Sequence, residues 1–458
     1  MLIGFSVSNF KSFYEPQNIS FVASKITRHK NHTVLKGKRR ILKSGLIFGA
    51  NASGKSNLIR AIDFSRNVII NGLEQVDTNK KHFRINNNAF TEPGVFEYRI
   101  IANEKEYSYG IALSYSKKEI IGEWLTRIND NNTETCIFYR EVNDDGISIV
   151  SSEVIKNDEQ SLRIKVYLDD FGTNISDSLK KKTILSDISQ RTNTAEGALL
   201  EIVSVFLWFQ NIDFIFPSSQ YNGLSDVAND NSLRNFFSKV ISYFDTGINS
   251  VEGQDQRIDF DVILRGLPKE DAERIKIDVS NNVSESPKTY IIQDQILTLR
   301  QDENGNIVYS KMLLNHGNPG DLFEYADESD GTQRLFDLIP IFFESRTSSV
   351  IFIDEIDRSL HTNLTRKFLE LFYELSDDNS CQIIATTHDS NLLDLDLVRQ
   401  DEIWFVERNP DHSSKIYSLN KFKQRFDKKI EKEYLIGRYG AIPSLSDIVL
   451  ETESDPYD

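Results

Sequence analysis

The octapeptide Gly49-Ala50-Asn51-Ala52-Ser53-Gly54-Lys55-Ser56 decides how the rest of the chain is interpreted. It fits the phosphate-loop pattern of a glycine, four residues, then Gly-Lys-Ser. The apolar residues 45–48 before it predict a strand, and residues 57–62 after it are apolar at helical spacing. This strand–loop–helix order lets backbone N–H groups face a phosphate at a helix N-terminus. The octapeptide therefore predicts a nucleotide site, with a chance match on a surface turn as the alternative.

The residue types of the loop suggest individual roles. Lys55 is expected to reach the β- and γ-phosphates, and the Ser56 hydroxyl is expected to be a ligand of Mg²⁺. The predicted nucleotide contacts come from the loop and the start of the helix: Gly49, Asn51, Ala52, Ser53, Gly54, Lys55, Ser56 and Asn57.

Composition bounds the class of protein. With 458 residues, the chain is long enough for two or three domains. It contains no apolar run of the ~18–20 residues that a membrane span needs, and its first residues do not resemble a signal peptide. Cys136 and Cys381 have no ligand-like spacing and suggest no disulfide framework. We expect a soluble, cytoplasmic protein without membrane contact.

Charge argues against a protein that coats nucleic acid with its whole surface, because the formal net charge is −16. A local basic groove stays open, and residues 25–43 are its best candidate. We interpret them first as a solvated connecting loop, and second as cations near a bound triphosphate or nucleic acid. The cations are Lys25, Arg28, Lys30, Lys36, Lys38, Arg39, Arg40 and Lys43.

Hydrophobic patterning predicts three kinds of segment. Alternating residues predict paired strands near both ends of residues 1–24, and an antiparallel layer over 96–101, 107–113, 120–129 and 135–141. Helix-like runs at 195–209, 231–244 and 268–279 mark a different module, in which strands are possible at 290–300 and 307–313. A helix, a strand, a helix and two more strands follow at 333–344, 349–353, 362–375, 381–386 and 402–406.

These segments predict an α/β fold with a mixed-sheet core, a flanking antiparallel β-layer and a large, mainly helical insertion. The predicted parts are 1–144 with the phosphate loop and β-layer, 145–315 as the insertion, 316–445 as the second part of the core, and 446–458 as an acidic tail. No heptad pattern is sustained over several repeats, so a long coiled coil is not expected.

An acidic pair follows the most apolar strand. Residues 350–353 are continuously apolar, as in a buried parallel strand, and Asp354 and Glu355 come directly after them. Carboxylates at this end of a strand project into the ligand crevice. Asp354 is the predicted Mg²⁺ ligand, and Glu355 is predicted to orient or deprotonate the attacking water. Helix-capping acids are the alternative.

Two further segments fit the same site. Ser329, Gly331 and Gln333 begin a predicted helix some 16 residues before the acidic strand, and they offer a hydroxyl and N–H groups to a phosphate. By itself this segment is also an ordinary N-capped helix. His388 follows the strand 381–386, where it can reach the γ-phosphate or the water, although a structural histidine is equally consistent.

Taken together, these motifs resemble an ABC-type ATPase of the SMC, RecF and OLD branch. On this resemblance 49–56 is the Walker A motif, 329–333 the signature, 350–354 the Walker B motif, 357–360 the D-loop and His388 the switch histidine. The opening residues 7–13 are also typical of such heads. Residues 403–407 and 437–443 are similar to bacterial AAA-family ATPases of anti-phage defence, the RloA- and AbiL-like proteins and the ATPase subunit of PARIS. The signature here reads Ser-Asp-Gly-Thr-Gln, and a Q-loop glutamine is not located.

The resemblance implies ATP and Mg²⁺ as cofactors and hydrolysis that depends on Lys55, Glu355 and His388. It implies a homodimer or larger homo-oligomer, in which the signature of one subunit closes over ATP held by another. It further implies a separately encoded effector, of which a nuclease is one class. We also hypothesise that the insertion recognises that partner or a trigger, because the ATPase core does not require this stretch. The alternatives are a RecF- or SMC-like ATPase that acts directly on DNA, a scaffold without turnover, and, least favoured, a transporter subunit.

Overall fold

The computed structural model describes residues 1–143, 145–155, 159–172, 175–192, 194–221, 223–257, 264–265, 269–282, 288–292, 295–301, 307–344, 350–376, 381–422 and 429–443. The chain forms two compact units. Unit 1 comprises Met1–Ile215, Ser345–Ile356 and Tyr373–Asp458, and unit 2 comprises Phe216–Glu344 and Asp357–Phe372. The division into four parts that the sequence suggested stays a prediction.

The central sheet of unit 1 has six strands in the order β11-β17-β18-β5-β19-β20. Adjacent strands from β11 to β19 are parallel, whereas β20 runs antiparallel to β19. The mixed-sheet core that the sequence predicted is therefore confirmed. The strands are β5 (Ser44–Phe48), β11 (Ile212–Ile215), β17 (Val350–Ile353), β18 (Gln382–Thr386), β19 (Ile403–Arg408) and β20 (Ser414–Ser418).

A second sheet of unit 1 is antiparallel, with the order β10-β9-β8-β7-β6-β1-β2. It confirms the predicted β-layer. The β6–β7 turn falls at residues 103–104, between the strands predicted at 96–101 and 107–113. The strands are β1 (Leu2–Ser8), β2 (Gln17–Ser20), β6 (Pro93–Ala102), β7 (Lys105–Ser114), β8 (Glu119–Ile128), β9 (Glu134–Val142) and β10 (Ser148–Ser151).

The cation-rich segment 25–43 is not simply a solvated loop, so that prediction is wrong for its second half. Strands β3 (Thr33–Lys36) and β4 (Arg39–Leu42) form an antiparallel hairpin. Lys43 is fully buried, and its Nζ donates a hydrogen bond to the carbonyl oxygen of Ser376 at 2.5 Å. Apolar Ile41 and Leu42, both buried, explain why this part of the segment packs against the core.

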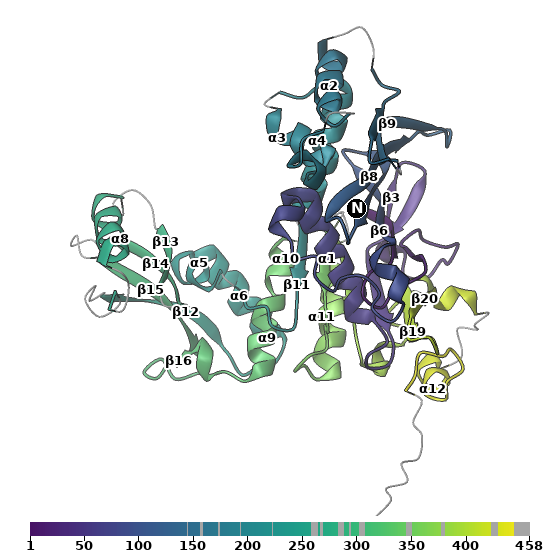
Figure 1. The fold of residues 1–458 in the computed structure, drawn as a ribbon. Coiled ribbons are helices and arrows are strands. Elements are labelled where there is room, and N and C mark those ends of the chain that lie inside the picture. Colours follow the sequence, from purple (N-terminus) through teal and green to yellow (C-terminus); the bar gives the residue numbers. More distant parts are fainter. Residues whose placement is uncertain are drawn as a thin grey trace, which may run out of the picture. The chain divides into compact units, whose positions relative to one another are not determined.

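Helices fill the space beside the two sheets of unit 1. Helix α1 (Lys55–Asn71) starts at the phosphate loop and buries Leu58, Ile59 and Ile62 on one face. Figure 1 shows α2 (Glu159–Asp170), α3 (Ile184–Arg191) and α4 (Gly197–Gln210) grouped together. Helix α4 packs Phe209 edge-on against Tyr98 of β6, which ties the helices to the antiparallel sheet. A short α12 (Ile430–Leu435) follows β20.

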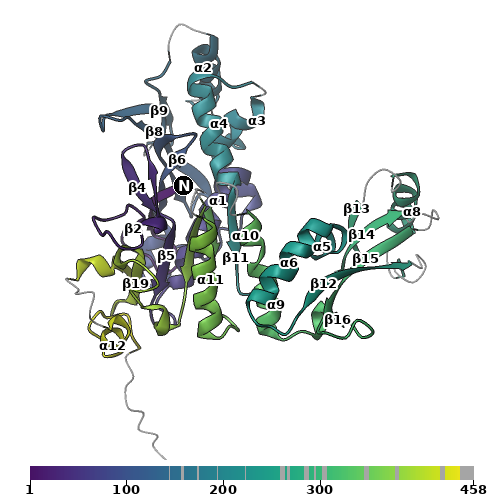
Figure 2. The same ribbon diagram turned by 180° about the vertical axis from the view of Figure 1, so that it is seen from behind.

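Unit 2 contains a five-stranded antiparallel sheet with the order β12-β15-β14-β13, in which β16 also pairs with β15. Helices α5 and α6 lie against this sheet (Figure 2). The strands are β12 (Ser250–Arg257), β13 (Lys288–Ile292), β14 (Gln295–Gln301), β15 (Ile307–Asn315) and β16 (Phe323–Glu324). The helices are α5 (Leu224–Asn229), α6 (Asn231–Tyr243), α8 (Lys269–Asn282), α9 (Asp330–Leu338), α10 (Pro340–Glu344) and most of α11 (Thr362–Leu375).

Both cysteines are free thiols. In the part of the chain that the structure describes, no helix has the length and apolar character to cross a membrane.

Candidate nucleotide-binding site

The loop between β5 and α1 has a backbone that favours glycine at both of its ends. The φ angles of Gly49, Ala52 and Gly54 are 157°, 60° and 112°. A Cβ atom on Gly49 would lie 2.3 Å from the carbonyl oxygen of Val406, and one on Gly54 would lie 2.2 Å from Ser414 Oγ. Side chains are therefore excluded at both glycines, because β19 and β20 press against the loop. Such turns leave backbone N–H groups directed at one point, which suits an anion.

Lys55 begins α1 and is almost entirely buried under the loop. Its Nζ donates hydrogen bonds to the carbonyl oxygens of Gly49 at 2.6 Å and Ala50 at 3.1 Å. The same Nζ lies 3.3 Å from His388 Nδ1, just after the end of β18. The lysine ammonium group is therefore held at the mouth of the loop.

The ends of β17 and β18 bring the acidic pair to the same place. Asp354 is 1% exposed, and its Oδ1 accepts a hydrogen bond of 2.6 Å from the Thr386 hydroxyl. The Thr386 oxygen in turn accepts the backbone N–H of Glu355 at 2.8 Å. Glu355 Oε1 lies 3.8 Å from His388 Nε2, and both side chains are partly exposed. Parallel pairing of β5, β17 and β18 thus gathers Lys55, Asp354, Glu355 and His388.

The residues present fit a magnesium nucleotide. Ser53 Oγ is buried in the loop and has no hydrogen-bond partner among the residues that the structure describes, so it is available to a phosphate oxygen. Lys55 carries a positive charge, and Ser56 and Asp354 are the residues whose oxygen atoms would hold Mg²⁺. The described residues contain no cluster of three or more His, Cys, Asp or Glu side chains suited to a metal. Mg²⁺ in nucleotide sites is bound by one or two protein oxygens together with the phosphates, so a single carboxylate is sufficient.

The remaining loop residues that the sequence predicts as nucleotide contacts differ in exposure and in hydrogen bonding. Asn51 and Ala52 are exposed, and Ser56 is half-buried. The Asn57 side-chain amide donates to Ser12 Oγ at 2.9 Å, so one of its donors already serves the packing of the loop. The assignment of these residues to nucleotide binding stays a prediction.

The signature-like segment belongs to unit 2. Ser329 caps α9, and its Oγ accepts the backbone N–H of Thr332 at 3.2 Å. Gly331 is backed by the chain after the acidic pair, since a Cβ there would lie 2.7 Å from the carbonyl oxygen of Ser359. Gln333 Nε2 donates to the carbonyl oxygens of Tyr325 and Glu328 at 3.2 and 3.0 Å. The capped helix that the sequence predicted is present, and its role toward a phosphate stays a prediction.

Sequence reasoning missed the residues that hold the loop and the acids in place. The sequence predicts Thr386 only as the end of a strand, whereas in the structure its hydroxyl links Asp354 to Glu355. Ser414 Oγ donates to the carbonyl oxygen of Ser53 at 2.6 Å, and its backbone N–H donates to the carbonyl of Ser12 at 2.7 Å. No spacing rule could reveal a bond between residues 361 positions apart.

Comparison with solved structures finds loose similarity to SMC heads. The SMC head domain from Thermotoga maritima is 15% identical, with coverage of 91% of this chain and 98% of that chain and a TM-score of 0.36. An SMC head crystallised with the C-winged helix domain of ScpA is 14% identical, with coverage of 92% and 98% and a TM-score of 0.39. Likenesses at this level carry no conclusion about function. No curated protein sequence matches.

A family model matches residues 46–394, which include the phosphate loop, the signature-like segment, the acidic pair and His388. Its description reads "AAA domain, putative AbiEii toxin, Type IV TA system". The match covers well over half of the chain, and the topology of the central sheet and the geometry of its loop agree with a P-loop ATPase fold. The chain therefore belongs to this AbiEii-type family of AAA domains.

Proposed function

We propose that the chain hydrolyses ATP to ADP and phosphate, and that this turnover switches a separately encoded effector in bacterial anti-phage defence. The observation that carries the enzymatic part is the approach of three functional groups from separate segments. Lys55 Nζ lies 3.3 Å from His388 Nδ1, and His388 Nε2 lies 3.8 Å from Glu355 Oε1. A phosphate-binding cation, a carboxylate and an imidazole at this spacing suit the transfer of a phosphoryl group to water.

Each group has a distinct task in this proposal. Lys55 stabilises charge on the β- and γ-phosphates, and Ser56 and Asp354 hold Mg²⁺, which supplies further charge neutralisation to the phosphates when bound. Glu355 accepts a hydrogen bond from the attacking water and orients it or takes its proton. His388 lies within reach of both Lys55 and Glu355, where its ring can donate to the γ-phosphate or to the water.

The proposed active form is a homodimer or larger homo-oligomer. The Lys55 loop and the acidic pair belong to unit 1, whereas Ser329, Gly331 and Gln333 belong to unit 2. The capped start of α9 offers N–H groups to a phosphate, and the family resemblance supports closure of this segment over ATP held by a second subunit. ATP then stabilises the assembly, and hydrolysis releases it.

The regulatory role is supported by the family description, which refers to a toxin–antitoxin system. The effector is expected to be a separate protein, and the defence role predicts that ATP state controls its retention or release. A cytoplasmic location follows from this role.

The test combines turnover with capture of the partner. Lys55→Ala and Glu355→Gln should each lower kcat for ATP hydrolysis at least about 100-fold, the usual effect of losing a catalytic acid–base or charge-stabilising group. Glu134→Gln removes an exposed carboxylate from β9 and should leave turnover unchanged. Hydrolysis at the parent's rate in both active-site variants would refute the assignment.

Glu355→Gln also serves as the trap. Light scattering with ATP should show this variant as a dimer or larger oligomer, and pull-down from the native host after nuclease treatment should retain one protein. Recovery of DNA without a protein partner would replace the effector role with direct action on DNA.

A further inference from the structure

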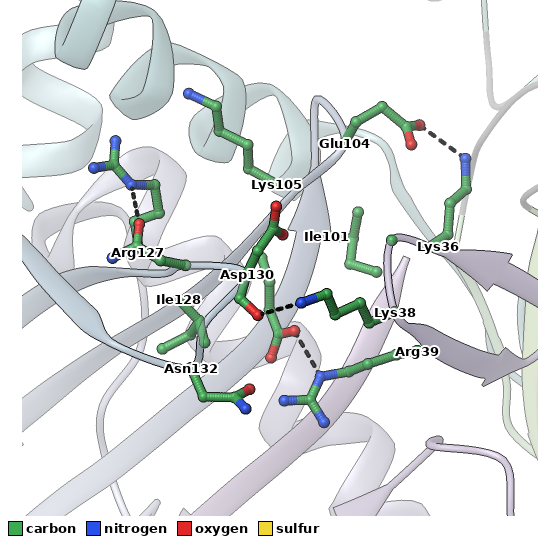
Figure 3. Close-up of a pocket in the computed structure, with 13 residues that line it drawn as sticks. Lys36, Lys38, Arg39, Ile101, Glu104, Lys105, Arg127, Ile128, Asp130 and Asn132 are labelled. Carbon is green, nitrogen blue, oxygen red and sulfur yellow. Dashed lines mark hydrogen bonds and ion pairs between the residues drawn. The ribbon is translucent and has the colours of Figure 1, made fainter.

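Three turns of unit 1 enclose a cavity of about 490 Å³ that the phosphate-loop chemistry does not use. They are the β3–β4, β6–β7 and β8–β9 turns, and Figure 3 shows their side chains around the cavity. Strand β4 leads into the N-terminal end of β5, whereas the phosphate loop follows the C-terminal end of β5. The lining residues are Lys36, Gly37, Lys38, Arg39, Ile101, Glu104, Lys105, Glu106, Arg127, Ile128, Asn129, Asp130 and Asn132.

The cations of this cavity outnumber the carboxylates that neutralise them. Glu106 is shared by two guanidinium groups, those of Arg39 at 2.7 Å and Arg99 at 2.5 Å. A single oxygen of Glu201 is likewise shared by Lys105 at 2.8 Å and Arg127 at 2.7 Å. Each of these two carboxylates carries one negative charge and faces two positive charges. One positive charge at each carboxylate is therefore not neutralised.

Lys38 adds a further positive charge, for which the described residues provide no carboxylate partner. Its Nζ donates to the backbone carbonyl of Asp130 at 2.9 Å, which is a neutral acceptor. Lys36 is paired with Glu104 at 2.8 Å. Five cations (Lys36, Lys38, Arg39, Lys105, Arg127) and three carboxylates (Glu104, Glu106, Asp130) line the cavity, a local excess of two positive charges in a chain whose formal net charge is −16. Arg99 and Glu201, which pair with lining residues from outside the cavity, cancel each other in this balance.

Two of these cations, Arg39 and Arg127, are partly buried and held in position. The side chains of Arg39 and Arg127 are 30% and 27% exposed, so their charges are less screened than on an open surface. Arg127 Nε donates to Asn129 Oδ1 at 3.0 Å, which orients the planar guanidinium group. An oriented guanidinium group binds the paired oxygens of a phosphate in two places at once.

A second cavity, with one apolar wall, adjoins the cationic one. It has a volume of about 480 Å³, and both cavities are lined by Lys36, Ile101 and Glu104. Its apolar wall comes from α4, where Leu207 is half exposed and the largely buried Trp208 also lines the cavity. A ligand that spans both cavities would have a phosphate-rich end and a flat, less polar end.

We propose that this pair of cavities binds a nucleoside polyphosphate at a second site, separate from the phosphate loop. The phosphates contact Lys38, Arg39 and Arg127, and the base lies toward Leu207 and Trp208. The size of the cationic cavity suits one small molecule, since pockets for such ligands measure ~300–1,000 Å³. A nucleic-acid surface instead needs a stripe that neutralises ~6–10 phosphates, far more than an excess of two charges provides.

The test uses the full chain with Lys55→Ala, which silences the phosphate loop, and isothermal titration with ATP, GTP and sodium tripolyphosphate. The Lys55→Ala chain should retain one nucleotide site. Adding Lys38→Ala and Arg127→Ala should raise Kd at least about tenfold, because two charge-assisted contacts are lost. Lys117→Ala with Lys118→Ala removes the same charge from the exposed β7–β8 turn and should leave Kd unchanged.

Several outcomes would overturn the proposal. Absence of binding to the Lys55→Ala chain, or an unchanged Kd after loss of Lys38 and Arg127, would exclude a second site here. Equal affinity for tripolyphosphate and the nucleotides would exclude base recognition by α4. A single-stranded oligonucleotide that binds more tightly than the nucleotides, and only while Lys38 and Arg127 are present, would assign the cavity to nucleic acid. Lys38→Gln alone changes an exposed side chain and should weaken binding without affecting the melting temperature.

Discussion

The buried carboxyl group of Glu123 should make the stability of unit 1 fall as pH rises through neutrality. Glu123 of β8 is fully buried, and burial raises its pKa from 4.5 to about 7. The shift persists although its oxygens accept hydrogen bonds from the N–H groups of Ile184 and Leu185 and from the Tyr109 hydroxyl, at 2.6, 3.0 and 2.9 Å. The carboxyl group joins β8 to the first turn of α3.

The sign of the effect follows from proton binding. Between the unfolded pKa of 4.5 and the folded pKa of about 7, the folded state holds a proton that the unfolded state has lost. This contribution to stability is fully present below pH 4.5 and is lost as the pH rises through about 7. Integrating the linkage for one proton gives a loss of about 2 kcal/mol between roughly pH 5.5 and roughly pH 8.5.

Glu123→Gln removes the titration, so the difference between parent and variant isolates it. Urea unfolding followed by tryptophan emission is a suitable assay, because all three tryptophans, Trp124, Trp208 and Trp404, belong to unit 1. The unfolding free energy of the parent minus that of Glu123→Gln should fall by about 2 kcal/mol across this pH range. Glu134→Gln, at an exposed position on β9, should give a constant difference. A constant or rising difference for Glu123→Gln would refute the reasoning.

Two further predictions concern residues that position the candidate site. Thr386→Val removes the hydroxyl that donates to Asp354. Loss of a hydrogen-bond partner of a metal ligand typically costs ~10- to 100-fold in activity, so kcat for ATP hydrolysis should fall by this factor. Steady-state kinetics that show an unchanged kcat would contradict this role. Ser414→Ala removes the hydrogen bond to the carbonyl oxygen of Ser53. A loss of about 1 kcal/mol of ATP-binding free energy should raise KM for ATP ~5-fold, while kcat changes little. Equal KM values in the parent and the variant would show that the loop keeps its shape without this bond.

The elements that the sequence predicted well are those with a strong local signal. The antiparallel layer largely alternates buried and half-buried residues along β6 and β7, β17 is apolar throughout, and β18 has an apolar centre at residues 383–385. The phosphate loop is a contiguous pattern, so its strand and helix could be located from eight residues. In these segments local preference and final structure agree.

The features that sequence reasoning missed depend on contacts between distant residues. Strand β11 has only four residues, and it becomes a strand by pairing with β17, which lies more than 130 positions later in the chain. The β3–β4 hairpin is rich in cations, so its sequence suggests a solvated loop rather than paired strands. In the structure, Lys36 and Arg39 form ion pairs with carboxylates on the β6–β7 turn and β7. No local pattern contains this information.

The backbone of Glu355 illustrates how the geometry of the acidic pair depends on the neighbouring strand β18. Glu355 has a φ angle of 54°, a left-handed conformation that costs a non-glycine residue ~1 kcal/mol or more. Three hydrogen bonds with Thr386 offset this cost: from its hydroxyl to Asp354, from the N–H of Glu355 to that hydroxyl, and from the N–H of Ile356 to its carbonyl. The left-handed turn leaves the carboxylate of Asp354 buried and brings that of Glu355 to His388. The roles that we propose for the two acids, metal binding by Asp354 and water activation by Glu355, therefore require that β18 fixes the turn between them.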